Sequence, residues 1–557
     1  MRLLRSFAAP HGAGVRAGLV TASLAASLMA SAASPAALTA QATPGTFPAA
    51  DATLERLWRL GMDSSRVMQL GQTLLDSVGP RLTGTPLQRN AAAWVAGLYT
   101  SWGVTATQQQ IGTWRGWRRG TSHIDLLTPR VRTLEATMLA YSPGTKKKDV
   151  TAGTLILPRF ADSTAFVAWL PQAKGKFVLV SAPQPTCRPT DNWTQFATPA
   201  SKARMDSTRS ALSREWGGSN VRGTGLSNAL GTGSLGMRLE EAGVAGVVTS
   251  RPKNAWGTID VFETYNTKAP ALALSCEDYG LVFRLTENNQ APTMRVNLDA
   301  ELLGEQPIFN TIGTLRGSEK PDEYIVLSAH FDSFDGGSGA TDNGTGTLTM
   351  LEAMRLIATA YPKPKRTIIV GHWTAEEHGL VGSRAYVEDH PEVVKGLQAL
   401  FNQDGGTGRT TSIGAGGLPN GGVHLQQWLA KLPTEASAQI TPRIPGSPSG
   451  GGSDDASFAC HGAPAFGLGG VSWDYGNYTW HTNRDTYDKV VFDDVKFNAT
   501  LVAMLAYLAS EDPTMITRER ANLDRAAQPG AAGGATPGAF TWPTCQLAPR
   551  QTNPRLR

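Results

Sequence analysis

Histidine and carboxylate side chains of the kind that bind catalytic metals recur in the second half of the chain. Seven of the nine histidines lie between residues 330 and 481. Imidazole and carboxylate, with coordination positions left open, are the ligands that catalytic zinc prefers. Two histidines and three carboxylates exceed the needs of one zinc ion and suit two ions about 3.5–4 Å apart that share one carboxylate. The candidate residues are His330, Asp332, Asp342, Glu376, Glu377, Asp404 and His481.

Two such ions can polarise a scissile carbonyl group, lower the pKa of a bridging water and hold the oxyanion that develops. The water still needs a base to accept its proton. The doublet Glu376-Glu377 offers both functions, because adjacent residues after a strand point in different directions. One glutamate can bind metal while the other remains free, so the pattern indicates metal-assisted hydrolysis.

The elements that must position these residues are predicted from apolar runs. Buried strands are expected at 324–329, 367–370, 397–401 and 463–468, with helices at 348–360 and 495–508 between and after them. Alternation of strands and helices predicts an α/β sheet covered on both faces. The candidate residues follow the strands, where ligands bind in open sheets of this class.

The first half of the chain has a different organisation. Residues 51–110 are predicted to be helical, interrupted by a loop at Gly79–Gly84. Short strand-like runs dominate residues 120–300, with one good helix at 235–242. We expect an inserted β-rich region here that acts as a lid or spacer. The basic segments Trp114–Arg119 and Lys146–Lys148 are interpreted as solvated edges or turns.

Composition limits the remaining possibilities. The 557 residues are 41% apolar and carry a formal net charge of +5 without a dense basic block, which argues against nucleic-acid binding. Residues 1–42 resemble a signal peptide that ends in Ala40-Gln41-Ala42, and no later stretch is apolar enough to span a membrane. Four cysteines allow three disulfide pairings, and the tail from 516 to 557 is predicted to be disordered.

Five motifs identify a family resemblance. They occur in the order "SAHFDS", "GATDNGTG", "WTAEEHGLVGS", "NQDGG" and "WHTNRDT". The chain thereby resembles the co-catalytic di-zinc exopeptidases, which include bacterial leucyl aminopeptidases, carboxypeptidase Q and the glutamate carboxypeptidases. The middle motifs "YSPGT", "GKFVLV" and "PALALSCEDYGLV" make the carboxypeptidase Q-like branch the nearest.

The resemblance implies a phosphorylase/hydrolase-like mixed sheet with helices on both faces. It implies a catalytic domain split between residues 43–120 and 300–515, with a protease-associated domain inserted at 121–299. It also implies a role for each candidate residue. His330 and Asp404 would hold one zinc, Glu377 and His481 the other, Asp342 would bridge both, Glu376 would be the general base and then acid, and Asp332 would orient His330.

Other residues near the motifs are assigned more weakly. Tyr475 or Tyr478 is the candidate donor to the oxyanion, whereas His372 and His378 match no ligand position and are expected to be structural. Relatives often have Ser-Asp-His before the fourth strand, and this chain has Ser453-Asp454-Asp455 instead.

The function expected is therefore that of an exported enzyme with two Zn²⁺ ions per chain. It would hydrolyse small peptides as an aminopeptidase, dipeptidase or carboxypeptidase, through a water that bridges the metals. Manganese or cobalt can replace zinc in carboxylate-rich sites. Arg409 and Arg484 are candidate anchors for a substrate carboxylate, and a homodimer remains open. The alternatives are a receptor-like binding protein on the same fold and an enzyme like glutaminyl cyclase.

Overall fold

The computed structural model describes residues 43–229, 231–523 and 542–552. Residues 1–42, where the sequence predicts a signal peptide, lie outside this part of the chain. No helix among the described residues has both the length and the apolar character needed to cross a membrane.

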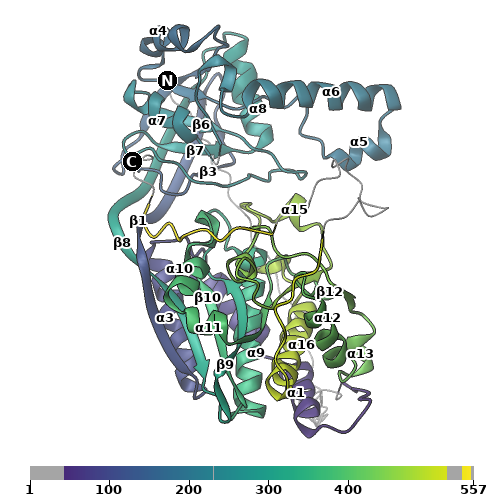
Figure 1. Cartoon of the computed structure of the whole chain (residues 1–557). Helices are drawn as coiled ribbons and strands as arrows, with labels where there is room; N and C mark the ends of the chain where they lie inside the picture. The colour runs from purple at the N-terminus through teal and green to yellow at the C-terminus, as the bar shows by residue number, and fades with distance from the viewer. Residues whose placement is uncertain (1–42, 230, 524–541, 553–557) are drawn as a thin grey trace, which may run out of the picture. The chain divides into compact units, whose positions relative to one another are not determined.

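A mixed β-sheet positions the predicted site (Figure 1). Its centre consists of four neighbouring parallel strands in the order β14-β11-β9-β10, which confirms the four strands predicted from the apolar runs. Strands β12 and β13 extend the sheet beyond β14, and β8 and β1 extend it beyond β10 through antiparallel pairing. The bounds are β1 Thr105–Thr128, β8 Thr293–Leu315, β9 Lys320–His330, β10 Arg366–Trp373, β11 Leu397–Asn402, β12 Thr410–Gly414, β13 Thr441–Arg443 and β14 Ala465–Gly470.

Both faces of the central strands are buried, as the unbroken apolar runs predict. Along β9, Ile325 and Leu327 belong to one hydrophobic core, and Val326 between them belongs to another on the opposite face. The first core contains the packing surfaces of α1 (Ala52–Asp63), α9 (Thr345–Ala360) and α16 (Phe492–Glu511). The second contains those of α10 (Val381–Asp389), α11 (Pro391–Lys395) and α14 (Asp455–Ala459). The sheet is therefore fixed between two helical layers.

The N-terminal helices belong to the same core. In α1, Leu54, Leu57 and Trp58 are buried at helical spacing, and the carboxylate of Asp51 caps the helix by accepting from the backbone N–H groups of Thr53 and Leu54 at 3.0 Å. Helices α2 (Val67–Gln72) and α3 (Pro86–Ser101) follow. Helices α1 and α2 pack against α9 and α16, which lie more than 200 residues later in the sequence.

Two long strands, β1 and β8, were missed by the sequence analysis. They pair antiparallel over almost their whole length and continue through the domain boundaries expected at residues 120 and 300. The segment Trp114–Arg119 lies within β1 and is not a solvated edge, since Trp117 is fully buried. Register shifts at Gly112 and Gly116–Trp117, together with many polar residues, obscure the alternation that normally reveals a strand.

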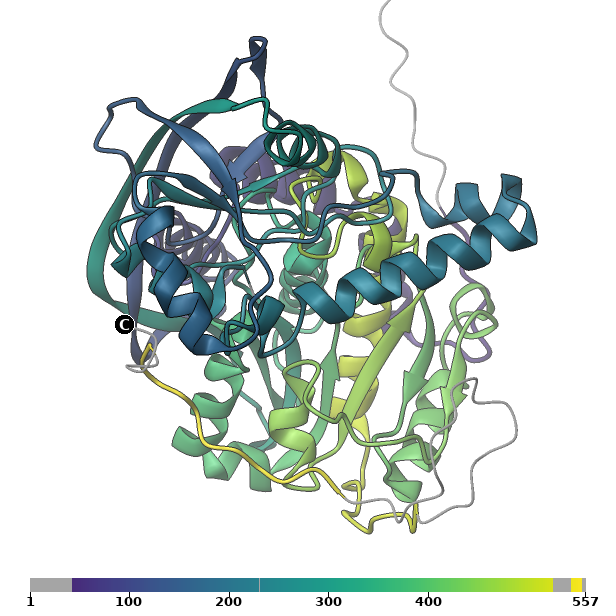
Figure 2. The ribbon, with the colours of Figure 1, turned by 90° about the horizontal axis from the view of Figure 1, so that it is seen from above.

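Residues 121–299 contain more helix than expected. Besides the predicted α7 (Gly233–Glu241), helices α4 (Ser163–Ala173), α5 (Thr190–Phe196), α6 (Pro199–Trp216) and α8 (Cys276–Glu287) are present. Only the final residue of α6, Trp216, is buried, which explains why α6 shows no apolar periodicity. Figure 2 shows α6 from above as one long helix. The strands of this region are β3 Ala136–Met138, β4 Val150–Ile156, β5 Phe177–Leu179, β6 Gly246–Thr249 and β7 Ala271–Leu274. Its assignment as a protease-associated domain stays a prediction.

The prediction of a disordered tail is wrong for the described residues of the C-terminal segment. Ile516 is buried, and the guanidinium of Arg550 forms ion pairs with Glu388 at 2.9 Å and with Asp389 at 2.7 Å. The carbonyl oxygen of Arg550 accepts from the backbone N–H of Thr113 at 2.9 Å. The segment is rich in Ala, Gly and Pro, and this composition gave no indication that Ile516 and Arg550 make specific contacts.

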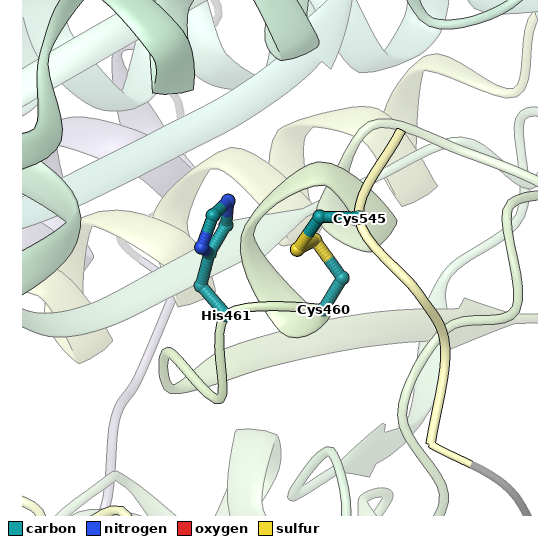
Figure 3. Close-up of side chains that lie close together, drawn as sticks. All are labelled: Cys460, His461 and Cys545. Carbon is teal, nitrogen blue, oxygen red and sulfur yellow. A yellow bond between two sulfur atoms is a disulfide. The ribbon is translucent and has the colours of Figure 1, made fainter. Parts of the chain in front are cut away.

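Two disulfides resolve the cysteine pairing as Cys187–Cys276 and Cys460–Cys545. The second bond attaches the C-terminal segment to the end of α14. His461 lies beside it, but the two sulfur atoms are bonded to each other, so these three residues do not provide thiolate ligands for a metal (Figure 3). Structural disulfides indicate an oxidising compartment.

The disulfide between Cys460 and Cys545 should contribute measurably to stability. It closes a loop of 85 residues, which restricts the unfolded chain, so the double variant Cys460→Ser/Cys545→Ser should lose about 2–4 kcal/mol of free energy of unfolding. Denaturant unfolding of the oxidised proteins measures this loss. An unchanged midpoint would show that the C-terminal segment is held by its other contacts alone.

Candidate active site

The structure brings the candidate residues together at one edge of the sheet. His330 is the last residue of β9, Glu376 and Glu377 follow β10 in the short helix η4 (Glu376–His378), and Asp404 follows β11. Because β11, β9 and β10 are parallel neighbours, their carboxyl ends meet at the same edge. Asp342 comes from the turn η3 (Ala340–Gly344) before α9, and His481 from the loop after α15 (Tyr475–Tyr478).

Asp342 lies between two groups of donor atoms. Its Oδ1 atom is 3.4 Å from His330 Nε2, which is itself 3.2 Å from Asp404 Oδ1. Its Oδ2 atom is 3.2 Å from His481 Nε2, which is 2.9 Å from Glu377 Oε2. Each group of three side chains offers ligand atoms within 4.8 Å of one another. The two oxygen atoms of this one carboxylate therefore face two different pairs of side chains, His330 with Asp404 and His481 with Glu377.

The charge and hydrogen bonding of this cluster fit a pair of cations. Asp342 Oδ2 and Glu377 Oε1 are buried and accept no hydrogen bond from the residues that the structure describes. Buried carboxylates without such partners are costly unless a cation balances them. Imidazole and carboxylate donors with no thiolate are the set that catalytic zinc uses. The residues present therefore fit two zinc ions, with Asp342 shared.

The pKa values of the protein groups show the same imbalance. Burial would lower the pKa of His330, but the carboxylates of Asp404 and Glu376 raise it well above its usual range. Burial likewise opposes protonation of His481, whereas Glu377 and Asp342 raise its pKa to about 10. Burial raises the pKa of Glu377 to about 7. In the protein without metal, protons therefore supply the positive charge that the carboxylates require.

Glu376 and Asp332 lie beside the two groups and outside them. Burial raises the pKa of Glu376 well above its usual range, and the negative charges of Asp404 and Asp454 add to this effect. Asp332 orients His330 through its backbone, since its carbonyl oxygen lies 3.1 Å from His330 Nδ1. Its carboxylate Oδ1 instead accepts from the backbone N–H of Glu376 at 3.0 Å. Asp332 thus fixes both a candidate ligand and the candidate base.

Two further residues that fix the cluster were not identified from the sequence. The buried guanidinium of Arg81 donates to the carbonyl oxygens of Phe331, Ser338 and Gly339 at 2.8–2.9 Å, which holds the loops on either side of Asp332 and Asp342. The buried carboxylate of Asp485 accepts from the backbone N–H groups of Thr341 at 2.7 Å and Asp342 at 3.0 Å. Asp485 lies in the motif "WHTNRDT", whereas Arg81 bonds to carbonyl groups and leaves no charge pattern.

A segment of residues 258–265, which we call the strap, holds the loop that carries His481. The backbone N–H of Val261 donates to the carbonyl oxygen of His481 at 2.8 Å, and that of Ile259 donates to Asn483 Oδ1 at 2.8 Å. The ring of Phe262 meets the imidazole of His481 edge-on, with centroids 5.1 Å apart. The strap belongs to the region expected to be a lid or spacer, yet it contacts a candidate metal ligand directly.

The strap also reaches the loop of Glu377, through Glu263, which contacts His378 in that loop and forms a buried ion pair with Arg115 of β1. Glu263 lies 2.7 Å from the guanidinium of Arg115 and 3.5 Å from Nδ1 of His378. The guanidinium lies between the rings of Tyr141 and Tyr265, 3.9 and 4.0 Å from their centroids. His378 therefore has packing and hydrogen-bonding partners outside the ligand groups. So does buried His372, whose Nε2 lies 2.5 Å from the hydroxyl of Tyr99.

The structure distinguishes between the two candidate oxyanion donors and gives the contacts of the two candidate carboxylate anchors. Tyr475 is half-buried near the cluster, where desolvation and the charges of Asp342 and Asp404 raise its pKa well above the usual range. Tyr478 is exposed. Arg484 forms an ion pair with Glu135, and the backbone N–H of Arg409 donates to Asp494. Neither arginine lines the large cavity beside Asp404.

Comparisons with known proteins relate the chain to a family of peptidases. Residues 310–506 match the family model described as Peptidase family M28. Carboxypeptidase Q from Bos taurus is 24% identical over 447 residues, which cover 80% of this chain and 85% of that protein. A glutamate carboxypeptidase 2 homolog from Caenorhabditis briggsae is 30% identical over 219 residues, or 35% of this chain and 27% of its own. The structure of a peptidase M28 precursor from Shewanella amazonensis has a TM-score of 0.59 at 24% identity, covering 83% of this chain and 97% of that one, so the fold is shared.

The contact between the strap and the cluster can be tested with Glu263→Gln. The variant leaves the guanidinium of Arg115 without its buried partner, so the free energy of unfolding should fall by roughly 3–5 kcal/mol. Displacement of the Glu377 and His481 loops should also weaken one bound zinc about 10–100-fold. Chemical unfolding and zinc titration against a chelator measure the two effects.

The matched control is Glu301→Gln, which removes an exposed partner of Arg118 on the same pair of strands. This control variant should leave both the free energy of unfolding and the zinc affinity close to their wild-type values. Equal zinc affinity in Glu263→Gln and the wild type would show that the strap does not position the ligands.

Proposed function

Because residues 310–506 belong to peptidase family M28, we propose that the chain is a zinc-dependent exopeptidase with two metal positions and Glu376 as general base. The observation that carries the proposal is the placement of Asp342, whose two oxygen atoms face separate groups of ligand atoms. A binding protein without catalytic activity would need neither this shared carboxylate nor the free glutamate beside it. Carboxypeptidase Q, which is similar over most of the chain, supports peptide substrates.

The proposed roles follow from the contacts. His330 and Asp404 would hold one ion, Glu377 and His481 would hold the other, and Asp342 would contribute to both positions. Zinc at these positions would polarise the scissile carbonyl and make a water molecule more acidic. Glu376 accepts a proton as the water oxygen bonds to the carbonyl carbon. It returns that proton to the leaving nitrogen as the carbon–nitrogen bond breaks.

The surroundings support these proton transfers. Glu376 lies beside the proposed ligands and outside both groups, so its carboxylate is free to accept a proton from the water and to pass it to the leaving nitrogen. Asp332 fixes the backbone of Glu376, so the carboxylate is oriented before substrate binds. We assign donation to the developing oxyanion to Tyr475, because the alternative, Tyr478, is exposed. The two disulfides support action in an exported, oxidising compartment.

Replacement of the base is the direct test. Glu376→Gln should lower kcat by about 10²–10⁴-fold because the amide cannot accept the proton, while two zinc ions per chain remain bound. A peptide library read by mass spectrometry, with and without chelator, measures activity and also shows from which end residues are removed.

The matched control is Glu392→Gln, at an exposed glutamate on α11. This variant should retain wild-type turnover and zinc. Full activity in Glu376→Gln would show that Glu376 is not the general base. Full activity after complete removal of zinc would show that the reaction does not need the metal.

Zinc binding should also release protons. His330 and His481 have raised pKa values in the protein without metal and are protonated at neutral pH, whereas a ligand must be unprotonated. Loading at pH 7 should release about two protons per chain from these histidines, and zinc affinity should fall as the pH is lowered. Calorimetry in buffers of different ionisation enthalpy measures the release. Affinity that stays constant between about pH 6 and 8 would contradict the assignment of these ligands.

A further inference from the structure

A cavity of about 980 Å³ adjoins the proposed metal centre, and Asp404 is part of its wall. The wall also includes residues from β12, β13, β14 and the segment after β13. Because Asp404 is a proposed metal ligand, a peptide held at the metals would have this space beside its scissile bond. The cavity is large enough for a long side chain.

Small residues give the cavity its depth. Ser412 and Gly414 on β12, and Ala465, Gly467 and Gly469 on β14, line it at alternate positions, as residues on one face of a sheet must. A Cβ atom at Gly414 would meet nothing within 4 Å, so this strand faces open space. Apolar groups of Pro442, Ile444 and Leu468 line other parts of the wall.

A buried carboxylate lines the cavity as well. Asp455 is 8% exposed, and a Cβ atom at Gly467 would lie 3.5 Å from its Oδ2 atom. Burial raises its pKa to about 6, partly opposed by a hydrogen bond with Ser449, so it is ionised at neutral pH. It forms no ion pair with any lysine or arginine that the structure describes. Arg443 also lines the cavity, but its exposed side chain is screened by water.

We propose that this cavity is a subsite for a basic side chain of the peptide substrate, with Asp455 as its specificity-determining residue. A buried carboxylate without a cation is costly, and the ammonium of lysine or the guanidinium of arginine would balance it. The apolar wall would cover the methylene groups of such a side chain. The proposal rests on the exopeptidase function and adds a class of substrate to it.

The test compares lysine with norleucine, which has a similar aliphatic chain and no charge. Dipeptides of lysine, norleucine or glutamate with alanine, in both orders, are offered to the zinc-loaded enzyme. For the lysine peptide, kcat/KM should exceed that for the norleucine peptide by at least about 30-fold, the smallest effect usual for a buried charge pair. In Asp455→Asn this ratio should fall to about 1. The control Asp493→Asn, at a highly exposed aspartate, should keep the wild-type ratio.

Equal or greater efficiency with norleucine or glutamate in the wild type would overturn the proposal, as would an undiminished ratio in folded Asp455→Asn. Calorimetric binding of the lysine and norleucine peptides to zinc-loaded Glu376→Gln tests the specificity of the cavity in the absence of turnover. If the wild type hydrolyses no peptide, the exopeptidase function fails. Tighter binding of the lysine peptide would then still support the subsite, and equal binding of both peptides would overturn it.

Discussion

The concentration of buried negative charge at the carboxyl ends of β9, β10 and β11 is the constraint around which the molecule is organised. Carboxylates this close together repel one another and lose hydration, so the fold is stable only if donors and cations surround them. The protein supplies part of the compensation through Arg81, the imidazoles of His330 and His481, and backbone N–H groups held at fixed angles. The remaining charge is what makes the cluster suitable for divalent ions. Stability and chemistry therefore have the same electrostatic origin.

The inserted region takes part in this arrangement, and its role as a lid or spacer stays a prediction. The strap hydrogen-bonds to the loop of His481 and places Glu263 beside His378, the residue after Glu377. Glu377 and His481, the two residues proposed as ligands of one metal position alone, are thereby both supported by the strap. The two ions would consequently differ in their environment, one held by loops of the central sheet and the other dependent on the insertion.

Much of the site could be predicted because its residues occupy defined positions after strands with unbroken apolar runs. The strand ending at His330 and the doublet Glu376-Glu377 are examples in which local sequence determines both the element and its polar end. Glu263 and Arg81 could not be found in this way, because their roles depend on partners more than 100 residues away. β1 was missed for a local reason, since its bulges and polar residues break the alternation of a half-buried strand. The contacts of Arg550 were hidden in a tail whose composition is typical of disorder.

The pairing of β1 with β8 has a consequence for biosynthesis. Residues 105–128 find their partner only at residues 293–315, and α1 packs on α16 at residues 492–511. Contacts of such high sequence separation form slowly, because a long loop must close before any of them is gained. The apolar faces of the early helices thus remain partly uncovered until residues 492–511 have been synthesised. During that interval the exposed apolar surface makes the nascent chain prone to aggregation.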